Sequence, residues 1–522
     1  MMRRRAILTL WALWGVAIGL GASARAGAPE LRAAEEALGA WNMAEAEAAI
    51  ARLNAEAPQD PKHLRLTGEL HLLRGEYEKA VEFLNQAVHS GSDPLAKHYL
   101  ELAKNTHEET KGYVQHLTAD GHWLISHPPG IDAVLVPYAE EALARIWRAH
   151  TQAFDFVPER PVRIEIYPTV DVLGAVSPLT VAEIRTSGTI ALCKYNRLMV
   201  TSPRDLVYGY EWLDTIGHEF IHLLITKKSG NTVPIWLHEG LAKYYEAAWK
   251  DVAPALERHS EALLAKAIAA DSLISFEAMS PSMAKLPSQE ATATAFAEVF
   301  TVIAFLNERH GRDVAAPLVD AMRRGQSDRD AVAALAGMPF DRFSRAWKAF
   351  LKQQGYRADA GDHDERLFFK GAHSEADELA ELKADKARDF VWLGDRMRLK
   401  QRWKAAAKEY RQAVTVVGDR SPLVQAKLGL ALLRQGAPEE AAVELEKPLA
   451  HSTHYVVLYV YLGEALLKMG RYADARVHLE RALTLNPFDP DVHGNLAIVY
   501  DHLGEGALAA RERQAHALVN AR

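Results

Sequence analysis

Residues 212–245 read WLDTIGHEFIHLLITKKSGNTVPIWLHEGLAKYY, and this stretch decides the fold of the centre of the 522-residue chain. It carries His218-Glu219-Phe220-Ile221-His222 within a run whose apolar spacing predicts a helix from about Trp212 to Lys227. Ser229-Gly230-Asn231 breaks that helix, and Pro234 can begin another. The sequence therefore predicts two helices joined by a short turn.

The first of these helices carries two histidines in a pattern suited to a metal ion. His218 and His222 are four residues apart, so both imidazoles face one side of the helix and can reach the same ion. Glu219, the residue directly after His218, can lean over an open coordination position and take a proton from bound water. These residues predict a metal centre with a general base beside it.

Glu239 on the second predicted helix is the candidate third ligand. Sixteen residues separate it from His222, which allows a turn and an antiparallel return of the chain. Two histidines, one carboxylate and one water form a catalytic zinc site, whereas four protein ligands form a closed structural site. Zinc lowers the pKa of its water and polarises a carbonyl, so hydrolysis of an amide becomes feasible.

Three neighbouring residues are candidates for supporting roles. Asp214 and Glu246 are possible partners that hold the ligand histidines in place. His238 adjoins Glu239 but points about 100° away around the helix. We therefore expect His238 to pack or to line a cleft rather than to coordinate the ion.

The combined pattern resembles a known group of metallopeptidases. His218-Glu219-x-x-His222 followed by Pro234-x-Trp236-Leu237-x-Glu239-Gly240-x-Ala242 is similar to the gluzincins, which include thermolysin-like and aminopeptidase-N-like enzymes. With Gly188 to Pro203 added, the chain more closely resembles the bacterial peptidase MA-like domain that is often joined to tetratricopeptide repeats (TPRs). The resemblance covers roughly residues 112–350.

This resemblance implies an α+β zincin-like metallopeptidase domain. By it, His218, His222 and Glu239 would bind Zn²⁺, and Glu219 would be the catalytic base. The strand before the active helix, Thr189 to Cys193, would line the substrate cleft.

Two features depart from the family pattern. Many relatives carry a tyrosine on a later helix that stabilises the oxyanion, but Phe296 and Phe300 stand in the matching stretch. Loss of one oxyanion donor costs about 10²–10³ in rate. Lys243 stands four residues past Glu239, where some relatives have a carboxylate that orients a histidine. The alternative to an active peptidase is therefore a catalytically weak or inactive pseudo-peptidase.

Both ends of the chain carry a repeat of 34 residues. Gly436, Gly470 and Gly504 keep this step, and each has an alanine five residues later. Ala46 and Ala80 repeat the spacing near the N-terminus. The glycine would make a turn and the alanine would let two helices approach closely. The pattern resembles TPRs, and unrelated alanine-rich helical hairpins are the alternative.

Between the repeats the composition changes and strands are expected. Pro161 to Pro168 alternates apolar and polar residues, and Gly188 to Tyr195 and Leu198 to Thr201 predict two more strands across a turn at Asn196-Arg197. Tyr138 to Phe154 has helical spacing. The segment is therefore expected to be α+β, between all-α TPR arrays.

The N-terminus has the character of an export signal. Arg3 to Arg5 precede an apolar run, Ala6 to Leu20, and Ala24-Arg25-Ala26 offers a small-x-small cleavage site. An uncleaved membrane anchor is the alternative, although a run of about 15 apolar residues is short for a bilayer. We expect cleavage, no membrane span afterwards, and a periplasmic or extracellular location in a bacterium.

The composition of the chain argues against some functions and some kinds of site. The 61 Lys+Arg and 68 Asp+Glu residues give a net charge of −7, which argues against nucleic acid as a partner. A single cysteine, Cys193, excludes an intrachain disulfide and a cysteine-based zinc site.

These features predict five segments: a signal peptide at 1–26, TPR-like repeats at 27–110, a peptidase MA-like gluzincin domain at 111–352, a linker at 353–386, and TPR repeats at 387–522. The predicted function is that of an exported zinc metallopeptidase acting on a protein or peptide that binds the TPR grooves. The alternative is a periplasmic TPR scaffold for protein–protein interaction whose central domain is inactive.

Overall fold

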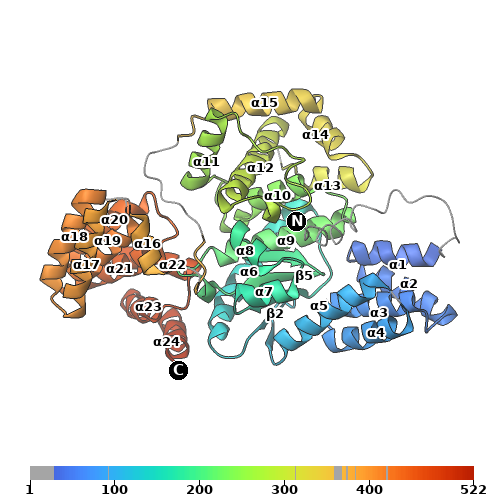
Figure 1. Ribbon diagram of the computed structural model, residues 1–522, viewed down its shortest axis with the longest axis horizontal. Coiled ribbons are helices and arrows are strands. Elements are labelled where there is room, and N and C mark those ends of the chain that lie inside the picture. Colours follow the sequence, from blue (N-terminus) through green and yellow to red (C-terminus); the bar gives the residue numbers. More distant parts are fainter. Residues whose placement is uncertain are drawn as a thin grey trace, which may run out of the picture.

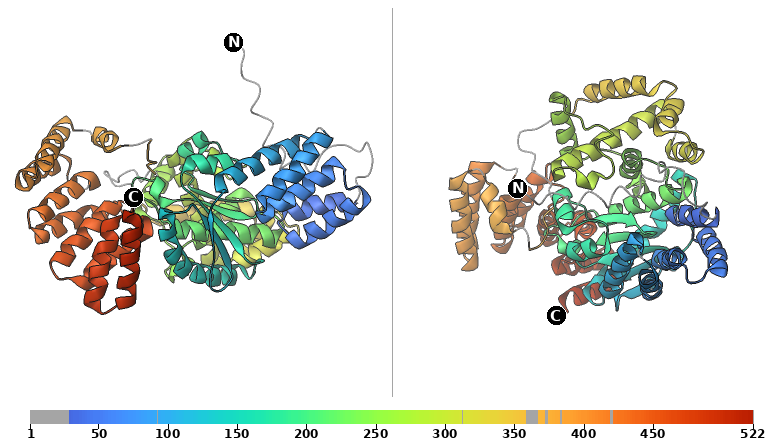
Figure 2. Two further views of the ribbon diagram at one scale, coloured as in Figure 1. Left: turned by 90° about the horizontal axis from the view of Figure 1, so that it is seen from below. Right: turned by 45° about the vertical axis from the view of Figure 1, so that its right-hand side comes forward.

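The computed structural model describes residues 29–91, 93–311, 313–357, 367–371, 374–382, 384–418 and 421–521. These residues are mostly helical, with a small mixed sheet in the central domain and one helical array on each side of it (Figures 1 and 2). The predicted signal peptide lies outside the described residues. Among the helices within the ranges above, none has both the length and the apolar character needed to cross a membrane.

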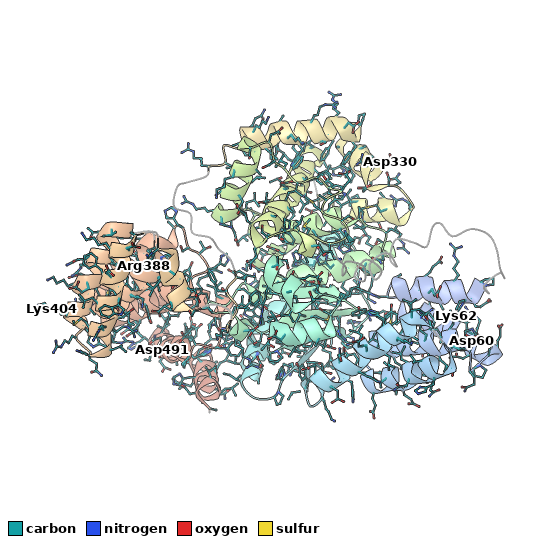
Figure 3. The ribbon with its side chains drawn as sticks, viewed as in Figure 1. Asp60, Lys62, Asp330, Arg388, Lys404 and Asp491 are labelled. Atoms are coloured by element: carbon teal, nitrogen blue, oxygen red, sulfur yellow. The ribbon has the colours of Figure 1, made fainter. Side chains whose placement is uncertain are left out.

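Five helices form the N-terminal array and connect it to the sheet. Several begin with a side-chain cap: Asp60, for example, accepts a hydrogen bond from the backbone N–H of Lys62, and both side chains are labelled in Figure 3. The helices are α1 (Pro29–Gly39), α2 (Met43–Glu56), α3 (Pro61–Arg74), α4 (Tyr77–Ser90) and α5 (Pro94–Thr110).

Eight helices form the C-terminal array. The predicted turn glycines Gly436, Gly470 and Gly504 adopt left-handed φ angles of 87°, 73° and 78°, which favour glycine. The helices are α17 (Asp385–Leu399), α18 (Trp403–Val417), α19 (Pro422–Arg434), α20 (Pro438–Leu449), α21 (Val456–Lys468), α22 (Tyr472–Leu485), α23 (Pro490–Leu503) and α24 (Gly506–Asn520).

Close packing within two hairpins of the C-terminal array follows the 34-residue period. A Cβ on Gly429 would lie 2.4 Å from the side chain of Leu445, and one on Gly463 would lie 2.5 Å from Leu479. The first helix of a hairpin therefore needs a glycine where the second inserts a large residue. The repeated alanines are fully buried; they are Ala46, Ala80, Ala406, Ala441, Ala475 and Ala509.

The central sheet has five strands in the order β1-β2-β3-β5-β4. The β2–β3 and β3–β5 pairs are parallel, whereas β1 and β4 pair antiparallel at the two edges. Ile164 of β3 lies opposite Ile125 of β2 and Leu198 of β5, and all three are buried. The strands are β1 (Val114–Leu117), β2 (Trp123–His127), β3 (Val162–Tyr167), β4 (Ala191–Lys194) and β5 (Arg197–Thr201).

The predicted turn between the last two strands is displaced by one residue. We expected it at Asn196-Arg197, but Tyr195 and Asn196 form it, with φ angles of 55° and 56°. Two successive positive φ angles make the tight turn that matches the twist of an antiparallel pair. Arg197 is therefore the first residue of β5, where its fully buried side chain joins a polar network.

Helices surround the sheet and continue beyond it. In Figure 1, α11, α12, α14 and α15 form a group above the sheet. The helices are α6 (Leu135–Phe154), α7 (Val170–Val176), α8 (Val181–Ser187), α9 (Trp212–Ser229), α10 (Ile235–Tyr245), α11 (Arg258–Ala269), α12 (Gln289–His310), α13 (Ala315–Arg323), α14 (Asp328–Ala336) and α15 (Phe340–Gln353).

The predicted linker, 353–386, is only partly described. Its described part contains a short helix, α16 (Glu375–Glu381), and Phe369, which forms an isolated bridge with Leu206 of the central domain.

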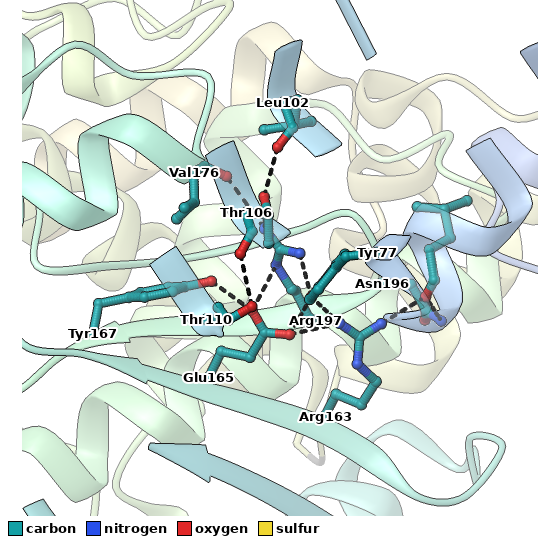
Figure 4. A network of polar contacts seen from close by, with 11 residues as sticks. Tyr77, Leu102, Thr106, Thr110, Arg163, Glu165, Tyr167, Val176, Asn196 and Arg197 are labelled. Atoms are coloured by element: carbon teal, nitrogen blue, oxygen red, sulfur yellow. Dashed lines mark hydrogen bonds and ion pairs between the residues drawn. The ribbon is translucent and has the colours of Figure 1, made fainter. Parts of the chain in front are cut away.

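A buried polar network joins the N-terminal array to the sheet (Figure 4). Glu165 on β3 accepts hydrogen bonds from Arg163 at 2.6 Å and from the Tyr167 hydroxyl at 2.6 Å. Arg197 Nε lies 3.4 Å from the same carboxylate, and Tyr77 of α4 contacts it through its hydroxyl. Burial opposes ionisation of Glu165, but the two arginines lower its pKa to about 2.

We expect Glu165→Gln to lower the free energy of unfolding by about 3–5 kcal/mol, because it leaves buried arginines without their carboxylate. Urea unfolding at pH 7 measures this, with the exposed Glu78→Gln on α4 as a control that changes by less than about 0.5 kcal/mol. The pKa of Glu165 is lower in the folded chain, so its contribution is complete above about pH 4.5 and is lost as the pH falls toward 2. A gap between the two proteins that stays constant across this range would contradict the network's role.

The C-terminal array also contacts the central domain through buried polar groups. Glu512 of α24 accepts a hydrogen bond from the Tyr138 hydroxyl of α6 at 2.8 Å and lies 2.7 Å from Nδ1 of His493. The backbone N–H of Tyr210 donates to the carbonyl of Leu485 at 2.9 Å. Both arrays are therefore fixed against the domain that carries the predicted site.

Candidate metal centre

Two antiparallel helices, α9 and α10, bring the predicted ligands together. The first ends at Gly230, whose φ of 69° is left-handed, and Asn231 continues the turn at a φ of 63°. Pro234 then precedes α10, as the sequence predicts. Helix α9 packs against β4 and β5, so its polar face opens beside the edge of the sheet.

The structure places His218, His222 and Glu239 in one cluster. One ligand atom from each lies within 4.8 Å of the other two. Glu239 Oε2 is 3.3 Å from His218 Nε2 and 3.2 Å from His222 Nε2. The three side chains are 12%, 13% and 18% exposed, so the cluster is half-buried at the floor of a cleft.

His218 is held from behind by a carboxylate. Its Nδ1 lies 3.0 Å from Glu246 Oε2, and Lys243 Nζ donates to the other oxygen of Glu246 at 2.6 Å. Lys243 occupies the position where some relatives have a carboxylate. Here Glu246, three residues later, contacts His218 instead. Asp214 is engaged elsewhere, because it accepts hydrogen bonds from Trp249 Nε1 at 2.9 Å and Lys250 Nζ at 2.6 Å.

His222 is held by another histidine, which the sequence did not predict. His238 Nδ1 lies 2.6 Å from His222 Nδ1, so one ring donates and the other accepts. Burial, with His222 next to it, lowers the pKa of His238 well below its usual value, so its ring is neutral and can accept. His238 also lines the cleft, as expected, and it contacts His222 in addition. The one feature of the sequence that could have pointed to this contact is the position of His238 next to Glu239.

The charges in the cluster depend strongly on one another. Burial alone would lower the pKa of His218, but hydrogen bonds to Glu239 and Glu246 raise it to about 10. Burial opposes ionisation of Glu239 in the same way, yet His222 and His218 hold the pKa of its carboxyl well below the usual range. Glu239 is thus a carboxylate with both histidines facing it.

Glu219 stands beside the cluster with one free oxygen. Its side chain is buried, and among the described residues Oε2 has no hydrogen-bond partner. Burial raises the pKa of its carboxyl, while the two histidines and the backbone N–H of Cys193 on β4 oppose that rise. A buried carboxylate with an unpaired oxygen is suited to exchange a proton with a molecule in the cleft.

The cleft runs along the edge strand β4 and has a volume of about 470 Å³, within the usual range for ligand sites. The predicted cleft strand, Thr189 to Cys193, lines it, together with Glu219 and the three clustered residues. Trp41, from the turn between α1 and α2, lines the cleft too. Its backbone carbonyl accepts a hydrogen bond from Lys227 at 2.6 Å.

Phenylalanine occupies the position that the family resemblance assigns to the oxyanion tyrosine. The ring of Phe296 on α12 lies 6.0 Å from that of His218, edge to face, and lines the cleft. Phe300 packs against Tyr244 with ring centroids 5.3 Å apart. Neither ring has a hydroxyl, so α12 offers no phenolic donor at these two positions.

Comparison with known families identifies the parts of the chain. Residues 138–353 match the Peptidase MA superfamily. Residues 31–96, 400–449, 432–497 and 466–512 match tetratricopeptide repeats. A Peptidase MA superfamily domain is flanked by TPRs. Proteins of this superfamily are generally metallopeptidase-like, and TPRs generally take part in protein–protein interaction.

The solved structures that match the chain include MamA, TTC0263 and Cut9-Hcn1. MamA is 26% identical over 24% of this chain and 74% of its own, with a TM-score of 0.23. A thermophilic TPR protein of Thermus thermophilus, TTC0263, is 21% identical over 26% of this chain and 74% of its own, with a TM-score of 0.24. The APC/C hetero-tetramer Cut9-Hcn1 is 12% identical over 95% of this chain and 94% of its own, with a TM-score of 0.24. No curated protein matches the sequence.

For a zinc ion held by the three clustered residues, we expect His238→Ala to weaken binding by about 10–100-fold, because His222 loses the group that fixes its ring. His238→Asn, which keeps a short acceptor in the form of an amide oxygen, should recover most of the affinity. Competition with a chromophoric chelator measures both constants. Equal affinity in His238→Ala and the unmodified protein would show that His238 only fills space.

Proposed function

We propose that the chain is an exported, zinc-dependent metallopeptidase of gluzincin type, with a zincin-like central domain that cleaves a protein or peptide recruited by the TPR arrays. One observation carries the proposal. The ligand atoms of His218, His222 and Glu239 converge within 4.8 Å, and buried Glu219, whose Oε2 has no hydrogen-bond partner in the described part of the chain, lines the same cleft.

The donor set fits zinc. Two imidazole nitrogens and one carboxylate oxygen are the ligands of many catalytic zinc sites, and they leave one position open. Both histidines are held through Nδ1, by Glu246 and by His238, which leaves each Nε2 directed at Glu239. Zinc, when bound by these three residues, polarises a carbonyl and makes water a better nucleophile at neutral pH.

Glu219 would move the proton in the reaction. Its Oε2 accepts a proton from the attacking water and later gives it to the nitrogen of the departing amine. The pKa of this carboxyl is raised toward neutral pH, so the group can both accept and release a proton during the reaction. The edge strand β4 offers backbone groups along which an extended peptide can lie, with its scissile bond facing Glu219.

Phe296 favours a second candidate function. Because the ring beside His218 has no hydroxyl, the oxyanion lacks the phenolic donor that relatives supply from this helix, and the rate would fall by about 10²–10³. A scaffold whose central domain binds but hydrolyses weakly or not at all is the alternative. The TPR arrays would then carry the function by protein–protein interaction.

The test is hydrolysis of a diverse pool of synthetic peptides by the purified full chain, followed by mass spectrometry. We expect defined cleavages that disappear with a zinc chelator and return when zinc is restored, because hydrolysis would require the ion held by the three ligand side chains. A zinc-loaded, folded protein that leaves every peptide of a broad pool intact would favour the scaffold. Cleavage that survives the chelator would contradict the zinc mechanism.

A further inference from the structure

A second cavity continues the cleft toward the C-terminal array. It has a volume of about 390 Å³, and Thr215, Lys243, Glu246 and Phe296 line both cavities, so the two join beside His218. Its far wall comes from the repeats, through Ser452, His454 and Tyr455. A peptide that lies across the metal centre would therefore place part of its length against the C-terminal array.

Aromatic rings form one wall of this second cavity. Tyr208 and Tyr455 have ring centroids 4.1 Å apart, and Phe368 meets Tyr208 edge to face at 6.2 Å. The Tyr208 hydroxyl donates to the carboxylate of Glu378 on α16 and lies 3.0 Å from the Tyr455 hydroxyl. Aromatic faces beside a carboxylate are favourable surroundings for a cation.

The lining is rich in carboxylates. Three of these carboxylates have basic partners. Lys243 pairs with Glu246, and two residues outside the cavity pair with others: Lys250 with Asp214, and Arg481 with Glu211. Glu257, before α11, and Glu290, in the first turn of α12, add negative charge to the lining, and Glu257 lies 3.6 Å from His454 of the C-terminal array. The six acidic lining residues are Glu211, Asp214, Glu246, Glu257, Glu290 and Glu378.

The far wall also contains a buried hydroxyl, that of Ser452. Ser452 is 5% exposed, it lines the cavity, and its Oγ makes no hydrogen bond to any described residue. A buried polar group without a partner costs free energy, so such a group indicates a place where a ligand completes the hydrogen bonding.

We propose that the second cavity binds the side chain of a lysine or arginine in the peptide, so that the chain selects substrates with a basic residue at a fixed distance from the bond beside Glu219. The ammonium or guanidinium group would donate to the carboxylates and to Ser452 Oγ, and its stem would lie against Tyr208 and Tyr455. Selection of a cleavage position rests on the proposed peptidase function, whereas binding of the basic side chain does not.

The first experiment measures binding without cleavage. Full-length protein carrying Glu219→Gln is titrated with fluorescent twelve-residue peptides that have a single lysine at successive positions, and with matched peptides in which that lysine is Nε-acetylated. We expect lysine to bind about 10-fold more tightly than acetyl-lysine at one position or two adjacent ones, because only the charged form makes charge-assisted hydrogen bonds. Equal binding of the two series at every position would overturn the proposal.

Variants assign the preference to this cavity. Glu257→Gln with Glu290→Gln should remove most of the 10-fold preference, and Ser452→Ala should reduce it severalfold, with binding of the acetylated peptides unchanged. Glu308→Gln, an exposed change on the same helix as Glu290, is the matched control and should keep the preference. A preference that survives in the double variant would also overturn the proposal.

Cleavage by the full chain with Glu219 intact separates this proposal from the proposed function. Lysine-dependent binding without hydrolysis would support the cavity and contradict the peptidase. Hydrolysis with no preference for lysine or arginine at any fixed position would support the peptidase and contradict the cavity. The two accounts can therefore fail independently.

Discussion

Glu219→Gln is expected to keep zinc and to lose peptide hydrolysis. The amide has nearly the shape of the carboxylate, and Glu219 is not among the three clustered ligand residues, so the metal centre should remain assembled. The amide cannot accept the proton of the attacking water, so kcat should fall by about 10²–10⁴-fold. Peptide hydrolysis and zinc content, measured on the same preparation, give the two halves of this result.

The exposed Glu308→Gln provides the comparison, since it makes the same chemical change on α12 away from the cluster. It should hydrolyse peptides at the rate of the unmodified chain. A Glu219→Gln protein with full activity would remove Glu219 from the mechanism, and one that lost its zinc would make it a structural part of the centre.

The double substitution His218→Ala/His222→Ala should have the largest effect on the metal. It removes two of the three ligands and leaves Glu239 alone, which should weaken zinc binding by at least about 10⁴-fold and abolish hydrolysis with it. Chelator competition measures the affinity. Circular dichroism of the same samples shows whether the helical fold is kept.

Two exposed histidines on the arrays supply the matched control. His89→Ala/His502→Ala removes the same chemical groups far along the sequence from the cluster, and it should leave zinc affinity unchanged. If the His218/His222 variant bound zinc as tightly as this control does, the metal would lie elsewhere in the protein.

Local patterns predicted the parts of the fold that depend on nearby residues. The break at Gly230 and the start after Pro234 placed α9 and α10 correctly, because helix ends are set within a few residues. The 34-residue repeat predicted the hairpins of both arrays for the same reason. The turn between β4 and β5 was wrong by one residue, since Arg197 is drawn into a buried contact with Tyr77, 120 positions earlier.

Contacts between distant segments could not be predicted. His238 supports His222 only because α10 returns antiparallel to α9 at one particular depth, and its contact fits no periodic pattern. The second cavity depends on Tyr208 and Tyr455 meeting across 247 positions, which requires the C-terminal array to dock on the central domain. Strands β1 and β2 were not predicted, and β1 is largely exposed, so its side chains lack the alternation that marks a half-buried strand.

The most direct test of the account is the zinc content of the purified full chain, because metal stoichiometry requires no knowledge of the substrate. The account predicts close to one zinc per chain in the unmodified protein and almost none in His218→Ala/His222→Ala. A folded, unmodified protein that binds no zinc under the same conditions would contradict it and would leave the TPR arrays as the source of function.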